Sequence, residues 1–404
     1  MLIKKQIPLL KDHHTHPSVY AALNNCLDLK YVSNKEDALS LIRQRDEEIN
    51  VVFGWNNSLY SFEKEELDNL PALLICNLSF HSFLMNESAK EKLCTSYNDI
   101  VSNIEDINWI EKNLSNILKL IVNIRPCTDK QITAFYNELL QQGIWYTEEM
   151  LLPNKAIFHQ FKELGYSERS LFWSDTDTFR SLDKETQKEI YGIKLFADGA
   201  LGPKTAAIKE PFLTGEKGLL MYSFNELHDI ITELSELNKP VAIHAIGDLA
   251  TEQVVAVLSK IKHAQDNTPS RVRIEHCQFI SKTNAEKAKS LGIILSMQPN
   301  FSYDSVQYSD RLSETDCSLN NPFRMLIDEV GYTPGNDLFF GSDGMPHGVD
   351  YALETSLFPP FPCQKLSLDE FIGGYCMEDM KNGCIDIEIN EEKQIVFSNV
   401  ILKK

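Results

Sequence analysis

Short runs of apolar, β-branched and aromatic residues alternate along this chain with longer amphipathic stretches. The short runs predict eight strands, at residues 6–12, 143–149, 169–174, 192–198, 240–245, 271–276, 292–298 and 337–342. The amphipathic stretches between them predict helices such as 129–142, 224–237, 250–264 and 283–291. Strands separated by helices of this length pair in parallel, through right-handed crossovers. The pattern predicts an α/β protein, a distorted (β/α)8 TIM barrel.

Two parts of the chain fall outside this alternation. Residues 18–128 are too long for one crossover helix and contain strand-like runs of their own. We interpret them as a subdomain inserted after the first barrel strand, which can supply walls or a lid for a pocket. Near the end, apolar and polar residues alternate on both sides of a turn at 390–393, which predicts a β-hairpin within residues 383–404. The barrel domain then spans residues 1–382.

The composition narrows the classes of partner. Lysine and arginine number 39 against 58 aspartates and glutamates, a net charge of -19. Such a surface repels nucleic-acid phosphates and anionic membranes, so we expect neither as a partner. The 9 cysteines form no C-x-x-C pair, and no apolar run approaches the roughly 18 residues of a membrane span. We expect a cytoplasmic protein with reduced thiols and a small-molecule substrate. Whether it forms a homodimer stays open.

Side chains that can bind a metal follow several of the predicted strands. In chain order they are His14, His16, Lys194, His244, His276 and Asp343. His14 and His16 are two residues apart, so on a strand both leave the same face. The strands of a barrel end at one mouth, where ligands from several of them can share a cation. A lone strand-end histidine is more often an ordinary core residue, but the ordered series favours a metal site.

Lys194 and Asp343 would give this site its chemistry. Lys194 lies in an apolar strand, where burial lowers the amine pKa, and a neutral amine can add carbon dioxide to form a metal-bridging carbamate. The alternative is an ion pair with Asp198 or another carboxylate. Asp343 would bind a metal and take a proton from metal-bound water, unless it is an exposed turn residue. The donors suit zinc, with iron, manganese or nickel as alternatives, and they predict hydrolysis.

These residues resemble the amidohydrolase superfamily and, within it, the YtcJ-like hydrolases of amidohydrolase family 3. Five segments carry the likeness, at residues 12–16, 192–207, 241–248, 273–278 and 341–343. The resemblance implies that the six residues bind one or two divalent metals, that Lys194 is carboxylated, and that Asp343 shuttles the proton. It implies that metal-bound hydroxide cleaves an amide-type C–N bond of a small molecule, with N-substituted formamides among the family's substrates. His81, Asn86 and Asp198 match pocket residues by the same likeness.

The chain departs from the family at two informative places. Only 13 residues precede His14, where family members carry half of a β-sandwich. We therefore expect a reduced or vestigial sandwich, in which residues 1–6 pair with the C-terminal hairpin. The second strand of the family usually ends in aspartate, whereas Glu149 stands here. We expect Glu149 to extend into the substrate pocket or to reach a metal.

Two other functions stay open. One is a mononuclear deaminase of a heterocyclic base, and the other is a catalytically degenerate barrel with a binding role. Deaminases usually pair the histidine of strand five with a nearby glutamate, whereas Asp248 stands here and Lys194 is available. The complete ligand series argues against a degenerate barrel. The substrate is not identified by the sequence, because specificity in barrels depends on loops.

Overall fold

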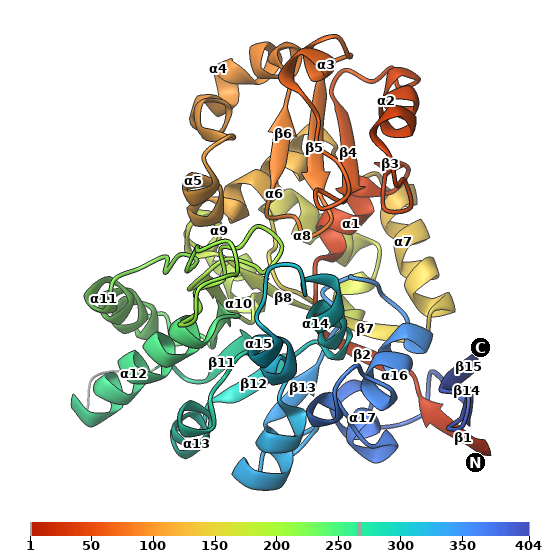
Figure 1. Ribbon diagram of the computed structural model, residues 1–404, viewed down its shortest axis with the longest axis vertical. Helices are drawn as coiled ribbons and strands as arrows, with labels where there is room; N and C mark the ends of the chain where they lie inside the picture. Colours follow the sequence, from red (N-terminus) through yellow and green to blue (C-terminus); the bar gives the residue numbers. More distant parts are fainter. Residues whose placement is uncertain (1, 265–268, 404) are drawn as a thin grey trace. The chain divides into compact units, whose positions relative to one another are not determined.

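The computed structural model describes residues 2–264 and 269–403. The chain divides into two compact units, Met1–Pro17 with Ile132–Lys404, and Ser18–Gln131. We call them the barrel unit and the inserted unit (Figure 1). Among the described residues, none of the helices has both the length and the apolar character that crossing a membrane requires.

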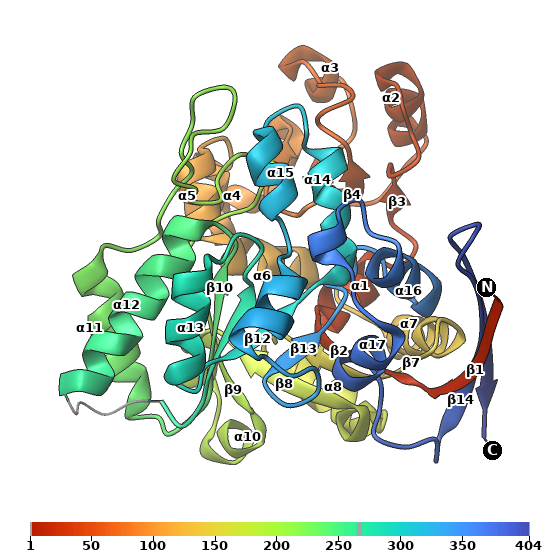
Figure 2. The ribbon, with the colours of Figure 1, turned by 60° about the horizontal axis from the view of Figure 1, so that its bottom comes forward.

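The barrel unit is built on a sheet of eight strands (Figure 2). In spatial order they are β2 (Leu10–Thr15), β7 (Ile144–Glu149), β8 (Ser170–Ser174), β9 (Gly192–Phe196), β10 (Val241–Ala245), β11 (Val272–His276), β12 (Ile294–Met297) and β13 (Leu338–Phe340). Every neighbouring pair is parallel. Spatial order follows chain order, which is the topology of a (β/α)8 barrel, so the predicted fold is confirmed.

Helices surround this sheet, as Figure 2 shows. They are α7 (Asp129–Gln141), α8 (Lys155–Glu163), α9 (Thr176–Ser181), α10 (Lys184–Glu189), α11 (Phe224–Ser235), α12 (Asp248–Ala264), α13 (Lys282–Ser290), α14 (Asp304–Gln307), α15 (Glu314–Leu319), α16 (Val349–Leu357) and α17 (Leu368–Tyr375). Helix α11 is typical: a capping box at Ser223 begins it, and it buries Leu227, Ile231 and Leu234 along one face. Gly292 follows the end of α13 and has a φ of 75°, a backbone conformation that glycine adopts readily at helix ends.

The barrel closes between β13 and β2 through side-chain and loop contacts. Asp12 accepts a hydrogen bond from the backbone N–H of Ser342 at 2.9 Å and another from the Ser342 hydroxyl. The N–H of Asp343 donates to the carbonyl of His14 at 2.7 Å. Burial raises the pKa of Asp12 to about 7, although the bonds from Ser342 and His14 lower it. Asp12 therefore joins the two ends of the sheet.

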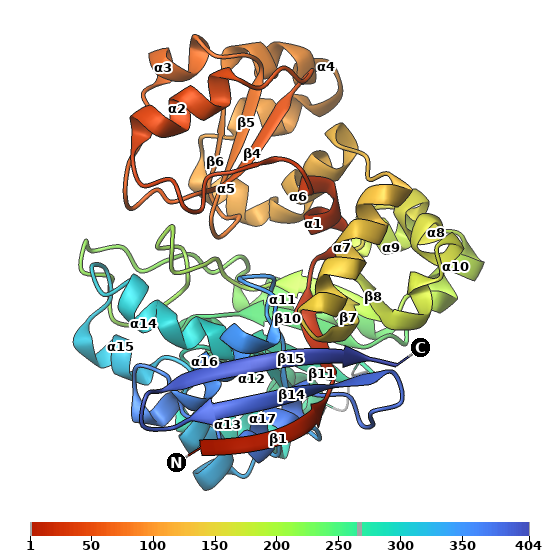
Figure 3. The ribbon, with the colours of Figure 1, turned by 90° about the vertical axis from the view of Figure 1, so that its right-hand side faces the viewer.

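The termini form a separate antiparallel sheet of three strands, which lie side by side in Figure 3. Strand β14 (Gly383–Asn390) pairs with both β1 (Leu2–Pro8) and β15 (Ile395–Leu402). This arrangement corrects the predicted first strand, because residues 6–8 belong to β1 and the barrel strand begins at Leu10. Apolar residues on both sides of the junction are buried, so hydrophobicity does not mark where the chain leaves one sheet for the other.

The inserted unit has its own small α/β core. Strands β3 (Leu27–Asp28), β4 (Asn50–Trp55) and β5 (Leu73–Asn77) are parallel, and β6 (Phe83–Met85) is antiparallel to β5. Its helices are α1 (Pro17–Leu23), α2 (Lys35–Arg43), α3 (Lys64–Asp68), α4 (Glu87–Asn103), α5 (Ile107–Lys112) and α6 (Leu114–Ile124). Leu39, Ile42, Val52 and Ile75 belong to one buried cluster between the sheet and α2.

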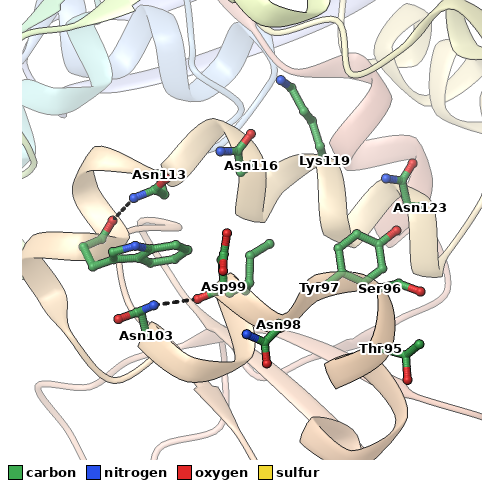
Figure 4. A pocket seen from close by; sticks show the side chains of 12 residues that line it. Thr95, Ser96, Tyr97, Asn98, Asp99, Asn103, Asn113, Asn116, Lys119 and Asn123 are labelled. Atoms are coloured by element: carbon green, nitrogen blue, oxygen red, sulfur yellow. Dashed lines mark hydrogen bonds between the residues drawn. The ribbon is translucent and has the colours of Figure 1, made fainter.

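The inserted unit also contains a polar hollow of about 750 Å³ (Figure 4). Tyr97 and Trp109 line it, and α4 departs from helical geometry at Tyr97. Asn103 and Asn113 donate hydrogen bonds to main-chain carbonyls of their own helical segments, at 2.8 Å and 2.9 Å. The lining contains none of the residues that the sequence singles out for chemistry.

Candidate metal centre

Three of the predicted ligands meet where β2 and β13 end. Nε2 of His16 lies 3.3 Å from Oδ1 of Asp343, and Nε2 of His14 lies 3.8 Å from the same oxygen. One ligand atom from each residue lies within 4.8 Å of the other two. Donors of a tetrahedral zinc ion at ~2.1 Å are about 3.4 Å apart. A small inward movement of these side chains would therefore place all three on one cation.

The four predicted histidines form a continuous row. Ring centroids are 5.7 Å apart for His14 and His16, 4.7 Å for His14 and His276, and 4.5 Å for His276 and His244. His244 and His276 come from the neighbouring strands β10 and β11. Side chains separated by hundreds of residues are thus brought to one place at the carboxyl ends of the strands.

Lys194 lies on β9, at the same end of the barrel as the histidines. Its side chain is buried, and among the described residues its Nζ has no hydrogen-bond partner. Burial lowers the pKa of Lys194 to about 8, although Glu275 and Asp343 raise it. The alternative ion pair with Asp198 does not form in the described structure, because the Asp198 carboxylate accepts backbone N–H groups from Ile246, Gly247 and Ala207.

Backbone strain turns two ligands toward the site. Arg273 and Glu275 face the barrel interior, so a regular strand would point His276 outward. His276 instead has a φ of 72°, and Asp343 a φ of 54°. Residues other than glycine rarely adopt such values, and the strain tends to be kept at functional sites. These two turns bring the imidazole and the carboxylate to the end of the barrel.

Each of three histidines has one ring nitrogen fixed by an acceptor. His14 Nδ1 lies 2.7 Å from Glu275 Oε2, and His276 Nδ1 lies 2.7 Å from Gln298 Oε1. His244 Nε2 lies 3.0 Å from the carbonyl of Gly199. Such contacts hold a proton on the bonded nitrogen and so define the tautomer. Sequence reasoning missed Glu275 and Gln298, for which the one available signal was a polar residue within or next to an apolar strand.

The protonation states suit metal ligands. Burial, followed by the charge of Lys194, lowers the pKa of His14 to about 4, and burial lowers that of His276 well below the usual value. Both imidazoles are therefore neutral at pH 7, which is the form that binds metals. Burial opposes ionisation of Asp343, but His14, His16 and Lys194 outweigh it and hold its pKa at about 2. Asp343 is thus a carboxylate.

Two further residues lie next to the ligands. Glu149 is fully buried, and its Oε1 is 3.9 Å from Nδ1 of His16. The same oxygen accepts the N–H of Leu151 at 3.1 Å. His347, which the sequence did not single out, lies 2.7 Å from the Thr15 hydroxyl through its Nε2. Its loop follows β13 and has no apolar periodicity that would have placed it at the site.

His81 and Asn86 lie in the inserted unit. His81 is buried there, and its Nδ1 is 2.7 Å from Oε2 of Glu111. The Asn86 oxygen accepts the N–H of Ala89 and begins α4, while its amide nitrogen donates to three main-chain carbonyls. Within the inserted unit, Asn86 therefore acts as a helix cap and a brace for the preceding loop.

Gly341 allows the end of β13 to lie close to β2, the strand that carries His14. A Cβ at this position would lie 2.4 Å from the His14 nitrogen and 2.9 Å from the His14 Cβ. We expect Gly341→Ala to lower the free energy of unfolding by about 1–3 kcal/mol and to weaken metal binding, because β2 must move. Urea denaturation and a zinc titration would measure both effects. An unchanged midpoint with unchanged zinc affinity would contradict this account of the contact.

Comparison with known proteins bears on this centre. A model of the amidohydrolase family matches residues 150–347. The putative amidohydrolase YtcJ of Bacillus subtilis (strain 168) is 27% identical over 389 residues, which cover 85% of this chain and 71% of that protein. The chain is therefore similar to the amidohydrolase family, and it is a hydrolase enzyme, as the sequence predicts.

Similar proteins also include an enzyme from Arthrobacter pascens and a hydrolase of known structure from Pyrococcus horikoshii OT3. The N-substituted formamide deformylase of Arthrobacter pascens is 30% identical over 141 residues, which cover 33% of this chain and 26% of that enzyme. The crystal structure of an uncharacterized metal-dependent hydrolase from Pyrococcus horikoshii OT3 gives a TM-score of 0.65 at 20% identity, covering 88% of this chain and 74% of that one. The structural match supports the fold described above.

Proposed function

We propose that this protein is a metal-dependent amidohydrolase that cleaves an amide-type C–N bond of a small molecule. The observation that carries the proposal is the convergence of His14, His16 and Asp343, with donor atoms within 4.8 Å of one another. We further propose that Lys194, His244 and His276 complete the ligand set. Nitrogen and oxygen donors of this kind suit zinc.

The buried donors fit a divalent cation. Lys194 Nζ and His16 Nδ1 are buried polar atoms that form no hydrogen bonds with the described residues. An unpaired buried amine is unfavourable, and carboxylation would turn it into an anionic oxygen ligand. We therefore propose that Lys194 carries a carbamate when metal is bound. Glu149, beside His16, is the residue we propose to shape the pocket at the end of β7.

The residues of the centre have different roles in the proposed hydrolysis. A bound divalent metal supplies a Lewis acid that polarises the substrate carbonyl and makes water more acidic. Asp343 is ionised and lies against His14 and His16, so it can accept the proton of the attacking water at a carboxylate oxygen. It would then return that proton to the leaving nitrogen. Glu275 and Gln298 hold two imidazoles in fixed orientations.

The substrate class is best sought among small amides. The deformylase of Arthrobacter pascens is similar to part of this chain, and it suggests N-substituted formamides as the first compounds to test. N-acyl amino compounds and cyclic amides form the comparison sets. Release of amine from any of these by the zinc-loaded enzyme would define the substrate, and inertness of all three sets would contradict the proposed bond type.

Removing the metal tests whether hydrolysis depends on it. We expect dialysis against a chelator to abolish hydrolysis and zinc to restore it, with about two metal ions per chain if a carbamate bridges them. Elemental analysis of the reconstituted protein measures the ratio. One ion per chain would favour a mononuclear deaminase, and none after reconstitution would favour a barrel with a binding role.

A further inference from the structure

A buried cluster of charged side chains lies in the barrel next to the candidate metal centre. It consists of Glu148 on β7 and of Arg273 and Glu275 on β11, which we call the ion cluster. Their exposed fractions are 3%, 7% and 0%. Arg273 Nη1 donates to Glu148 Oε2 at 2.7 Å, and Arg273 Nε donates to Glu275 Oε1. The guanidinium also stacks on the Trp173 ring, 4.7 Å from its centroid.

The ion cluster contacts two neighbouring residues of β2, His13 and His14. Glu275 Oε2 lies 2.7 Å from Nδ1 of His14, so one carboxylate bridges Arg273 and a proposed metal ligand. Arg273 Nη2 donates to the carbonyl of His13 at 3.1 Å, and Glu148 Oε1 lies 2.8 Å from Nδ1 of His13. The cluster therefore fixes both the imidazole of His14 and the backbone just before it.

The ion cluster places two buried carboxylates against one guanidinium inside the barrel. Buried ion pairs seldom stabilise a fold better than apolar residues of similar volume, so stability alone does not explain this arrangement.

We propose that Glu275, held in place by Arg273 and Glu148, is the positioning residue that prepares His14 for metal binding. It keeps the proton of His14 on Nδ1 and thereby directs the lone pair of Nε2 toward Asp343, which is 3.8 Å away. Its charge also makes the imidazole a stronger donor to a cation. This inference rests on the proposed metal-dependent function.

The substitution Glu275→Gln tests the proposal with little change in shape. The amide oxygen can accept from His14 only if the NH2 group turns toward the N–H of Arg273, which sets one donor against another. We expect zinc affinity, measured by competition with a chromophoric chelator, to fall about 10- to 100-fold. Glu111→Gln is the matched control, because Glu111 is a buried glutamate that contacts His81 Nδ1 at the same 2.7 Å. We expect its zinc affinity to equal that of the wild type.

Histidine NMR gives a readout that is independent of activity. In the zinc-loaded wild type labelled with 15N-histidine, long-range 1H–15N correlations should show His14 protonated at Nδ1, with slow exchange of that proton. The exchange should accelerate in Glu275→Gln and stay slow in Glu111→Gln. If Glu275→Gln does not fold, the wild-type spectrum still decides, because His14 protonated at Nε2 would overturn the proposal.

The outcomes separate this inference from the function on which it rests. A wild-type protein that binds no zinc would overturn both. A wild type that binds zinc, with Glu275→Gln folded, equal in affinity and unchanged in its His14 signal, would overturn the positioning role alone. Weaker binding and faster exchange in Glu275→Gln, with neither change in Glu111→Gln, would support it.

Discussion

The substitution Asp343→Asn should lower kcat/KM by about 10²- to 10⁴-fold while leaving the fold intact. Asparagine has nearly the same shape, but its amide cannot accept the proton of the attacking water. The loss should be large because Asp343 is held as a carboxylate, with a pKa of about 2, beside His14 and His16. Initial rates with the best substrate of the amide screen, together with thermal unfolding, would measure both parts of the prediction.

Asp337 supplies a matched control for this experiment. It directly precedes the same strand, β13, at the opposite end from Asp343, and it forms an ion pair with Lys289. Asp337→Asn should keep the wild-type rate, although it removes a carboxylate from the same strand. If Asp343→Asn hydrolyses the substrate as fast as this control, the proton-transfer role of Asp343 is wrong.

The substitution Lys194→Met should have opposite effects on metal binding and on stability. Methionine fills a similar volume but cannot form a carbamate, so zinc content and turnover should fall sharply. In the metal-free protein, the same change removes a buried amine whose Nζ has no hydrogen-bond partner among the described residues. We expect the free energy of unfolding to rise by about 1–3 kcal/mol, the usual cost of an unsatisfied buried polar group.

The stability gain should depend on pH in a defined direction. The pKa of Lys194 is about 8 in the fold, against an ordinary value of 10.5, so the unfolded chain holds this proton more tightly. The penalty in the metal-free wild type is therefore complete below pH 8 and shrinks as pH rises toward 10.5. Urea unfolding of both proteins at several pH values would test this. A Lys194→Met variant that is less stable than the wild type at pH 7 would contradict it.

The sequence predicted the barrel because parallel strands buried on both faces are nearly continuous apolar runs. All eight barrel strands were located in this way. The predicted start of the first strand was wrong. Ile7, Leu9 and Leu10 are all buried, although Ile7 belongs to β1, Leu10 belongs to β2 and Leu9 lies between the two strands. Periodicity shows which residues are buried, but it does not show which sheet they belong to.

The candidate site was only partly accessible to sequence reasoning. The order of the ligands along the strands indicated that they would converge, and the structure places His14, His16 and Asp343 together. Strand alternation alone would have turned His276 outward, because its positive φ depends on the surrounding fold. The partnership of Glu275 with His14 crosses 261 residues of sequence, and no local pattern encodes such a contact.

The proposed hydrolysis requires a single metal centre at these strand ends. A crystal structure of the zinc-loaded protein, with anomalous diffraction at the zinc edge, would show where the metal binds. We expect anomalous density at about 2.0–2.2 Å from donor atoms of His14, His16 and Asp343, with extra density for a carbamate on Lys194. Zinc bound elsewhere, or a bare Lys194 amine in a fully metallated crystal, would contradict it.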